Sequence, residues 1–268
     1  MLAFPGTKIN LGLSVKRKRT DGFHEVETVF YPLQYSDILE VVPSDSFGFQ
    51  SSGIEVPGEQ NNNLVVKAYD LMRSKYKTSI VKMHLHKLVP PGTGLGGGSA
   101  DAAAMLTLLD EISGLNLDFE ALETIASELG SDCPFFIHRK PSLAKGRGDV
   151  LYPLSLSLQG YFIVLVLPQI SISTVEAYKQ IKPKAPFYPP SEIIQEPVES
   201  WKGKLVNDFE ELPVVPDEIR QIKAHLYAKG ALYASLSGSG SAVFGIFNKK
   251  QNVEDLRKKY PVHVQMLK

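Results

Sequence analysis

A glycine-rich segment near the middle of the chain has the composition of an anion-binding loop. Glycine lets backbone N–H groups crowd toward one point without Cβ clashes. The first turn of a helix adds unpaired N–H donors and the positive end of the helix dipole. A strand-like run precedes the segment and an alanine-rich run follows it, so we predict a loop that holds nucleotide phosphates. Its residues are Pro90, Pro91, Gly92, Thr93, Gly94, Leu95, Gly96, Gly97, Gly98, Ser99 and Ala100.

Two common phosphate-binding motifs do not fit this segment. Gly92, Gly94 and Gly97 satisfy the dinucleotide fingerprint GxGxxG. That fold needs a strand directly after the helix, whereas Asp118 begins a second helix here. The Walker A motif needs a lysine before its serine, and this chain has Gly98 there. A flexible connector is the simplest alternative, although such linkers rarely join a clean strand to a strong helix.

Other polar residues are candidates for chemistry. Lys8 and Asn10 lie two residues apart in an alternating run, so both side chains point to one face of a strand. Taken alone, Lys8 is typical of a solvated edge strand, Asp132 of a helix cap and His24 of a hairpin. Cys133 has no activating histidine beside it, so we expect a buried, unreactive thiol.

The pattern of apolar residues predicts the elements that position these side chains. Strict alternation over residues 8–15 predicts a strand, and the runs 25–33 and 38–42 extend it into an antiparallel meander. Strands and helices are mixed rather than strictly alternating, which favours an α+β fold over a doubly wound α/β fold. Further strands are predicted at residues 81–85, 161–167, 242–247 and 262–267, and helices at 64–72, 100–112, 119–129 and 217–229.

The length and the pattern of elements indicate two domains. A chain of 268 residues is longer than one typical core. The strand pattern restarts beyond residue 153, so we predict domains at residues 1–153 and 154–268. The proline-rich stretch 182–197 is expected to be a surface excursion.

Composition and charge exclude several classes of protein. The 29 basic and 29 acidic residues balance, so no overall field favours nucleic acid or an anionic membrane. The longest apolar run, residues 161–168, is too short to span a bilayer, and no signal segment is apparent. The single cysteine cannot form an internal disulfide, which fits a reducing cytoplasm. We therefore expect a cytoplasmic protein, monomeric or weakly homodimeric, whose partner is a small molecule.

Six motifs, in this order along the chain, resemble those of the GHMP kinase superfamily. The glycine-rich segment is similar to the second motif of that superfamily. Within it, the chain is most similar to members that phosphorylate a cytidine-diphosphate sugar alcohol in non-mevalonate isoprenoid biosynthesis. The six motifs are residues 8–11, 21–24, 63–65, 95–100, 130–136 and 237–241.

The resemblance implies both a fold and a cofactor. The expected fold is α+β, with an N-terminal domain like ribosomal protein S5 and a ferredoxin-like C-terminal domain, and with ATP and acceptor meeting in the cleft between them. ATP is the implied cofactor. Mg²⁺ is expected to arrive with the nucleotide, and Ser99 is its only candidate ligand in the loop.

The resemblance also implies catalytic roles. Asp132 is expected to accept the proton of the substrate hydroxyl, while Lys8 orients the pair and offsets charge as the oxygen attacks the γ-phosphate. Because phosphoryl transfer with a loose transition state depends mainly on positioning and charge stabilisation, Asp132 acting through positioning alone is the alternative.

For the nucleotide, the resemblance assigns three further residues. Asn63 and Leu64 match the segment that meets adenine through backbone groups, and Lys87 matches a basic residue near the nucleotide. Without the resemblance, Asn63 is a helix cap and Lys87 a surface charge.

For the acceptor, the resemblance implies that His24 hydrogen-bonds cytosine while aromatic rings stack on the base. Phe23 occupies the place of an expected tyrosine, and Tyr178 supplies the second ring unless it belongs to the core. Lys145 approaches a phosphate or the base, or lies in a solvated loop. The remaining substrate-binding candidates are Asn10, Ser237, Gly238, Ser239 and Gly240.

Two rival functions stay open on the sequence. A homoserine or mevalonate kinase would share the motifs but would leave His24 no cytosine to read. A non-catalytic ATP-binding module would not need Lys8 and Asp132. The zero net charge weighs against a nucleic-acid-binding protein.

Overall fold

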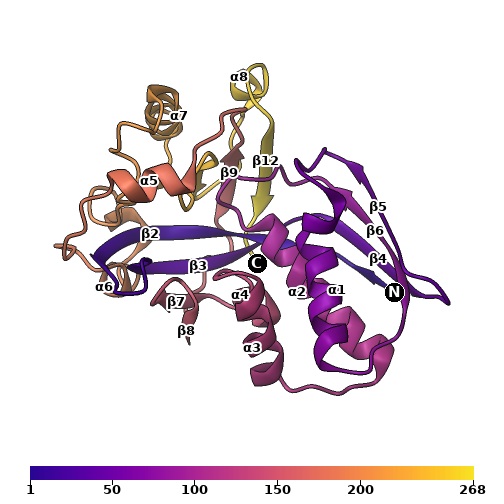
Figure 1. The fold of residues 1–268 in the computed structure, drawn as a ribbon. Helices are drawn as coiled ribbons and strands as arrows, with labels where there is room; N and C mark the ends of the chain where they lie inside the picture. The colour runs from indigo at the N-terminus through magenta and orange to yellow at the C-terminus, as the bar shows by residue number, and fades with distance from the viewer. The chain divides into compact units, whose positions relative to one another are not determined.

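The computed structural model describes residues 1–268 and contains three four-stranded sheets together with helices (Figure 1). No helix in it is both long enough and apolar enough to cross a membrane. The strands are β1 (Leu2–Ala3), β2 (Gly6–Lys18), β3 (His24–Ser36), β4 (Ile38–Pro43), β5 (Gly48–Gly53), β6 (Val81–Lys87), β7 (Ser142–Lys145), β8 (Val150–Pro153), β9 (Phe162–Val166), β10 (Tyr233–Leu236), β11 (Val243–Phe247) and β12 (Val262–Met266). The helices are α1 (Leu64–Lys75), α2 (Gly97–Ser113), α3 (Phe119–Leu129), α4 (Phe135–His138), α5 (Thr174–Gln180), α6 (Pro190–Ile193), α7 (Asp217–Ala228) and α8 (Glu254–Arg257), with 3₁₀ turns at Gln60–Asn62 and Val198–Ser200.

The chain forms two compact units that are interleaved in the sequence. Strands β2 and β3 contribute residues to both, whereas the sequence analysis placed one boundary after residue 153; that domain division stays a prediction. The first unit comprises Met1–Thr7, Pro32–Pro91 and Gly96–Arg139, and the second comprises Lys8–Tyr31, Gly92–Leu95 and Lys140–Lys268.

In the first unit, helices α1 and α2 pack against one face of the sheet β1-β4-β6-β5, and α3 packs against these two helices (Figure 1). Strand β6 alternates strictly, so Val81, Met83 and Leu85 enter the core while the residues between them face outward. Two helices begin at residues with good capping side chains. Asn63 accepts a hydrogen bond from the second residue of α1, and Asp118 accepts one from the third residue of α3.

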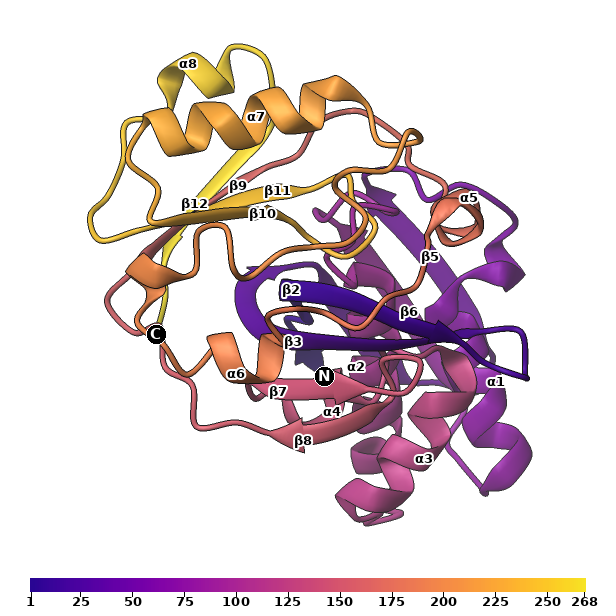
Figure 2. The same ribbon diagram turned by 90° about the vertical axis from the view of Figure 1, so that its left-hand side faces the viewer.

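The second unit contains the sheet β10-β11-β9-β12, in which all neighbouring strands are antiparallel. Helices α7 and α8 cover one face of this sheet (Figure 2). Val164 and Val166 of β9 meet Ile222 and Leu226 of α7 in the core. The sheet β2-β3-β7-β8 carries Lys8, Asn10, His24 and Thr28, which are considered below.

The long periodic segments confirm the predicted α+β class, because each predicted strand and helix overlaps an element of the same type. The proline-rich stretch 182–197 is only partly the surface excursion that was expected. Phe187 is exposed, but Pro190, Ile193 and Ile194 are buried. The expectation of an exposed segment was wrong for residues 190–194, because the short helix α6 places their apolar side chains on one face that packs against the protein.

Candidate active site

Lys8 lies in the buried part of β2, with 3% of its surface exposed. Its Nζ donates hydrogen bonds to Asn10 Oδ1 at 2.6 Å and to the carbonyl oxygen of Gly94 at 2.9 Å. The ammonium also lies 4.9 Å from the centre of the Phe30 ring. A buried ammonium is costly unless it is hydrogen-bonded, so these oxygens and the ring replace part of its hydration shell.

Asn10 connects Lys8 by hydrogen bonds to Thr28 on β3 and to Ser237 in the loop at residues 237–241. Its Nδ2 donates to Thr28 Oγ1 at 3.0 Å, and its backbone N–H donates to Ser237 Oγ at 3.3 Å. The Ser237 hydroxyl donates in turn to the carbonyl oxygen of Gly94 at 3.0 Å. Within the second unit, the structure thus brings together Lys8, Asn10, Ser237 and part of the glycine-rich segment, all of which the sequence had marked.

The glycine-rich segment is held in place by its neighbours. Leu95 O accepts from the Lys8 N–H, and Thr93 O accepts from the Ala242 N–H, both at 3.0 Å. Gly94 has φ +78°, and a Cβ there would lie 2.0 Å from Ser237 O. Only glycine allows this approach, and the segment is not a flexible connector.

Helix α2 starts within the segment. Its N-cap is Gly96 in the left-handed conformation, and no side chain caps the helix, so its first N–H groups have no side-chain acceptor. Ser99 in the first turn hydrogen-bonds the thiol of Cys133. Burial raises the pKa of that thiol to about 11, with the Ser99 bond opposing, so Cys133 is the buried, unreactive residue that was expected.

Beneath the start of α2 lies a buried charge cluster that the sequence analysis missed apart from Lys87. The Lys87 ammonium is 3% exposed, donates to Asp101 Oδ2 at 2.7 Å and pairs with Asp37. Asp37 Oδ1 also accepts the backbone N–H groups of Leu88 at 2.6 Å and Val89 at 2.8 Å. Asp37 therefore fixes the backbone that leads into the glycine-rich segment. An isolated aspartate between two strands gives no sequence signal for this role.

Asp101 is a carboxyl group of that cluster whose pKa is raised. Burial raises its pKa to about 7, against the opposing effect of the Lys87 charge. Its Oδ1 is buried and has no hydrogen-bond partner. Burial lowers the pKa of Lys87, but the two carboxylates outweigh it and the net shift is upward. The cluster therefore keeps a charged lysine and one carboxyl group that titrates near neutral pH.

Asn63 and Leu64 lie at the start of α1. Asn63 caps the helix by accepting the Val65 N–H at 2.9 Å, as the alternative interpretation expected. Leu64 lies against α2, since a Cβ on Gly98 would be 3.5 Å from Leu64 Cδ1. A cavity of about 440 Å³ adjoins this point, and its lining includes Phe49, Ser52, Ile54, Gln60, Asn62 and Asn63.

Asp132 lies in the turn between α3 and α4 and is half-buried. The N-cap of α4 is Pro134, with no side-chain cap bond, so the alternative interpretation of Asp132 as that helix's cap is wrong. Asp132 belongs to the first unit and Lys8 to the second. Their catalytic roles stay predictions.

Among the predicted acceptor residues, His24 and Tyr178 lie together. Their rings stack with centroids 5.0 Å apart at 23°, and Tyr178 also meets Phe209 edge to face. Burial, with a smaller contribution from the charge of Lys18, lowers the pKa of His24. Because the two rings stack on each other, a base can pack against the pair but cannot lie between them as they stand.

Phe23 and Lys145 each contact an aromatic or cationic side chain outside that ring pair. Phe23 is 52% exposed and stacks under the guanidinium of Arg147 at 5.0 Å. The Lys145 ammonium lies 5.6 Å from the ring centre of Tyr152. Both side chains therefore have partners of their own in this structure.

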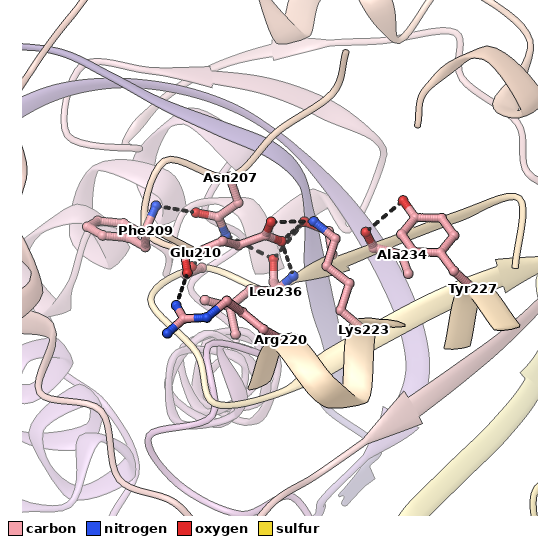
Figure 3. Close-up of polar contacts among 10 residues, drawn as sticks. Asn207, Phe209, Glu210, Arg220, Lys223, Tyr227, Ala234 and Leu236 are labelled. Atoms are coloured by element: carbon pink, nitrogen blue, oxygen red, sulfur yellow. Dashed lines mark hydrogen bonds and ion pairs between the residues drawn. The ribbon is translucent and has the colours of Figure 1, made fainter. Parts of the chain in front are cut away.

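The loop at residues 237–241 is supported by two residues that the sequence analysis missed (Figure 3). Asn207 Nδ2 donates to the carbonyl oxygens of Leu236 at 2.9 Å and Gly238 at 2.8 Å. Glu210 Oε1 accepts the Leu236 N–H at 2.8 Å. The predicted residue Ser239 meets Thr174, with their hydroxyl oxygens 2.7 Å apart. Buried amide and carboxylate side chains thus set the backbone of the loop.

Two family models match the chain: GHMP kinases N terminal domain over residues 63–140 and GHMP kinases C terminal over residues 194–262. The fold is shared with a mevalonate kinase from Methanococcus jannaschii, on which the structure superposes with a TM-score of 0.72 at 12% identity, over 100% of this chain and 98% of the other. The chain is a GHMP kinase with the N- and C-terminal domains of that class.

Within this class, the chain belongs to the family of 4-diphosphocytidyl-2-C-methyl-D-erythritol kinases. It is 49% identical to a kinase of that name from Bacteroides fragilis, over 94% of each chain. It is 50% identical to another from Azobacteroides pseudotrichonymphae, over 93% of this chain and 94% of the relative. A crystal structure of 4-(cytidine 5'-diphospho)-2C-methyl-D-erythritol kinase superposes with a TM-score of 0.83 at 30% identity, covering 100% of this chain and 99% of that one.

Proposed function

We propose that this chain transfers the γ-phosphoryl group of ATP to the 2-hydroxyl of 4-diphosphocytidyl-2-C-methyl-D-erythritol, a step toward isoprenoid precursors by the non-mevalonate route. The observation that carries the proposal is 48–50% identity to curated kinases of that name over more than nine-tenths of the chain. Homoserine and mevalonate kinases share the fold at 11–20% identity, which supports no particular acceptor.

The nucleotide is assigned to residues 90–100 and to the start of α1. Uncapped N–H groups at the start of α2 suit phosphate oxygens, and the pinned backbone of Thr93 and Leu95 reduces the entropy lost when they bind. Adenine is assigned to Asn63 and Leu64, beside a cavity whose 440 Å³ lies within the usual range for ligand pockets. Lys87 is committed to two carboxylates, so its proposed contribution is to hold the backbone before the loop.

Magnesium is proposed to enter with ATP. The described residues contain no group of three or more His, Cys, Asp or Glu side chains that could hold a metal ion. Ser99, in the first turn of α2, is the residue proposed to contact the ion. Bound Mg²⁺ would neutralise charge on the β- and γ-phosphates.

Catalysis is assigned to Asp132 and Lys8. Asp132 is proposed to accept the proton of the attacking hydroxyl, and Lys8 to offset the charge that develops on the transferred group. Asp132→Asn keeps the shape of the side chain but removes the base, so kcat should fall by about 10²–10⁴-fold. The Kd for ATP, measured by calorimetry, should stay within about twofold. A loss of ATP affinity equal to the loss of kcat would make Asp132 a structural residue.

The acceptor's cytosine is assigned to His24 and Tyr178, together with Phe23 and Lys145. The acceptor's phosphates are assigned to the loop Ser237, Gly238, Ser239 and Gly240 and to Asn10. The support is that Asn10 and Ser237 lie with Lys8 in one polar cluster.

We further propose a cytoplasmic enzyme that works as a monomer or weak homodimer. Its one cysteine is a free, buried thiol, which suits a reducing compartment. Light scattering during size-exclusion chromatography measures the mass in solution.

The function is tested by coupled ADP release with Mg-ATP and four acceptors in turn: 4-diphosphocytidyl-2-C-methyl-D-erythritol, CDP-choline, homoserine and mevalonate. We expect turnover with the first alone. Preference for homoserine or mevalonate would keep the GHMP class and overturn the proposed acceptor. ATP binding without turnover on any acceptor would favour a non-catalytic ATP-binding module.

A further inference from the structure

The outward face of the sheet β1-β4-β6-β5 carries two imidazoles aimed at one hydroxyl group. His84 Nε2 and His86 Nδ1 each lie 2.9 Å from Ser52 Oγ. The two histidines are on β6, and Ser52 is on the neighbouring strand β5. Two ring nitrogens from one strand therefore face a common point.

The alternation of β6 creates this arrangement. Val81, Met83 and Leu85 are buried against the helices, so His84 and His86 project from the opposite face and are only partly buried. Residues two apart on a strand stand about 6.5 Å apart on the same face. Both rings can therefore reach one ion, and neither is locked in the core.

An acidic side chain stands beside the pair. Glu40 on β4 is the direct antiparallel partner of His84 in the register, so both side chains lie on the same face of the sheet. Glu40 is exposed. Its negative charge beside the two imidazoles favours a bound cation.

We propose that His84 and His86 bind a divalent transition-metal ion of the zinc, nickel and copper group, with oxygen from Ser52 and from water completing the coordination. Imidazole nitrogen is a preferred ligand of these ions, whereas Mg²⁺ prefers oxygen. Metal–nitrogen bonds are about 2.0–2.1 Å, so a bound ion would replace the present hydrogen bonds between the two rings and the Ser52 hydroxyl. His84 and His86 have no role in the phosphoryl transfer proposed above, whereas Ser52 also lines the cavity beside the proposed adenine site.

Calorimetric titration of the nucleotide-free protein with ZnCl₂ tests the site. We expect saturable binding that His84→Ala and His86→Ala each weaken at least tenfold and that the double variant loses. Ser52→Ala should retain binding within about fivefold, because both imidazoles remain. His225→Ala, which removes an imidazole paired with Asp255 elsewhere, should leave this binding intact.

Two outcomes would overturn the site: no saturable Zn²⁺ binding to the native protein, or binding that survives in the double variant. Loss in Ser52→Ala as complete as in the double variant would also overturn the two-imidazole assignment. Because variants can misfold, a second readout uses the native protein alone. Zn²⁺ should shift the imidazole NMR resonances of His84 and His86, and unshifted resonances would reject the site.

Discussion

The Lys8 ammonium lies 2.6 Å from the side-chain oxygen of Asn10, whose amide nitrogen donates to Thr28 Oγ1 at 3.0 Å. The carboxamide is therefore held from both ends, because a flipped amide would point its NH₂ at the ammonium. Asn10 orients Lys8 without neutralising it, since an amide has no charge. A positively charged group in a fixed position is what stabilisation of a transferring phosphoryl group requires.

Removing the Thr28 hydroxyl should loosen this arrangement. Thr28→Val has nearly the same shape but leaves the Asn10 amide without its acceptor, a loss of about 1–3 kcal/mol for a buried group. We expect kcat to fall about tenfold, a factor that corresponds to 1.4 kcal/mol, while the KM for ATP changes little. Steady-state kinetics measure both. Thr28→Ser keeps the hydroxyl and should retain most of the activity; equal kcat values for Val and native protein would contradict the positioning role.

Gly94 and Gly92 offer a matched pair in the glycine-rich segment. Both have positive φ, at +78° and +70°, so alanine strains the backbone at either position. A Cβ on Gly94 would also lie 2.0 Å from Ser237 O, whereas one on Gly92 meets nothing within 4 Å. We expect Gly94→Ala to lower kcat/KM for ATP at least tenfold more than Gly92→Ala, a difference of about 1.4 kcal/mol. Equal effects would show that backbone strain alone matters here.

Asp101 should make the stability of the protein depend on pH. Its pKa in the folded chain is about 7, above the ordinary value of about 3.9 for an unfolded chain. Between these values the folded state binds more protons, so this group's contribution to stability is present at low pH and is lost as pH rises through 7. Asp101→Asn cannot ionise, so its stability relative to the native protein should rise from pH 5 to pH 8. Urea unfolding at several pH values measures this difference.

Glu196→Gln is the matched control for that experiment. Lys204 holds the pKa of Glu196 below its ordinary range, so this group stays ionised from pH 5 to pH 8. The difference in unfolding free energy between Glu196→Gln and the native protein should therefore be constant from pH 5 to pH 8. If the difference in unfolding free energy between Asp101→Asn and the native protein is also constant, Asp101 does not titrate between pH 5 and pH 8.

The His24–Tyr178 ring pair should determine affinity for the acceptor and not for ATP. Stacking of a base on an aromatic side chain contributes about 1–3 kcal/mol, so Tyr178→Ala should raise the acceptor KM about tenfold or more. Tyr178→Phe keeps the ring and should change KM little. His24→Ala should likewise raise the acceptor KM while leaving that of ATP unchanged. A rise in the KM for ATP of the same size would point to general disruption.

Local patterns were sufficient to predict the long elements and the loop. Alternation in β2 placed Lys8 and Asn10 on one face of the strand. Asn63 and Asp118 indicated the first turns of the helices that they cap. These features depend on residues close together in the chain, which is why a single sequence reveals them. Asp132 was predicted through family motifs rather than through any local pattern.

The supporting side chains could not be predicted in the same way. Asp37 reaches Lys87 and Asp101 across 50 and 64 positions, and Asn207 reaches Leu236 across 29. Each is an ordinary polar residue until the tertiary fold buries it beside its partner, because only burial makes an unpaired polar group costly. Lys87 shows the limit clearly, since the sequence allowed a surface charge and the structure buries it between two carboxylates.

Analysis of the reaction product by ³¹P NMR and mass spectrometry tests the central claim most directly. The protein is incubated with Mg-ATP and 4-diphosphocytidyl-2-C-methyl-D-erythritol. The account predicts one new phosphomonoester on the methylerythritol moiety, formed in equal amount with ADP and about 10²–10⁴-fold more slowly when Asp132→Asn replaces the native protein. Two results would contradict this claim: release of ADP together with free phosphate and no phosphomonoester, or no release of ADP at all.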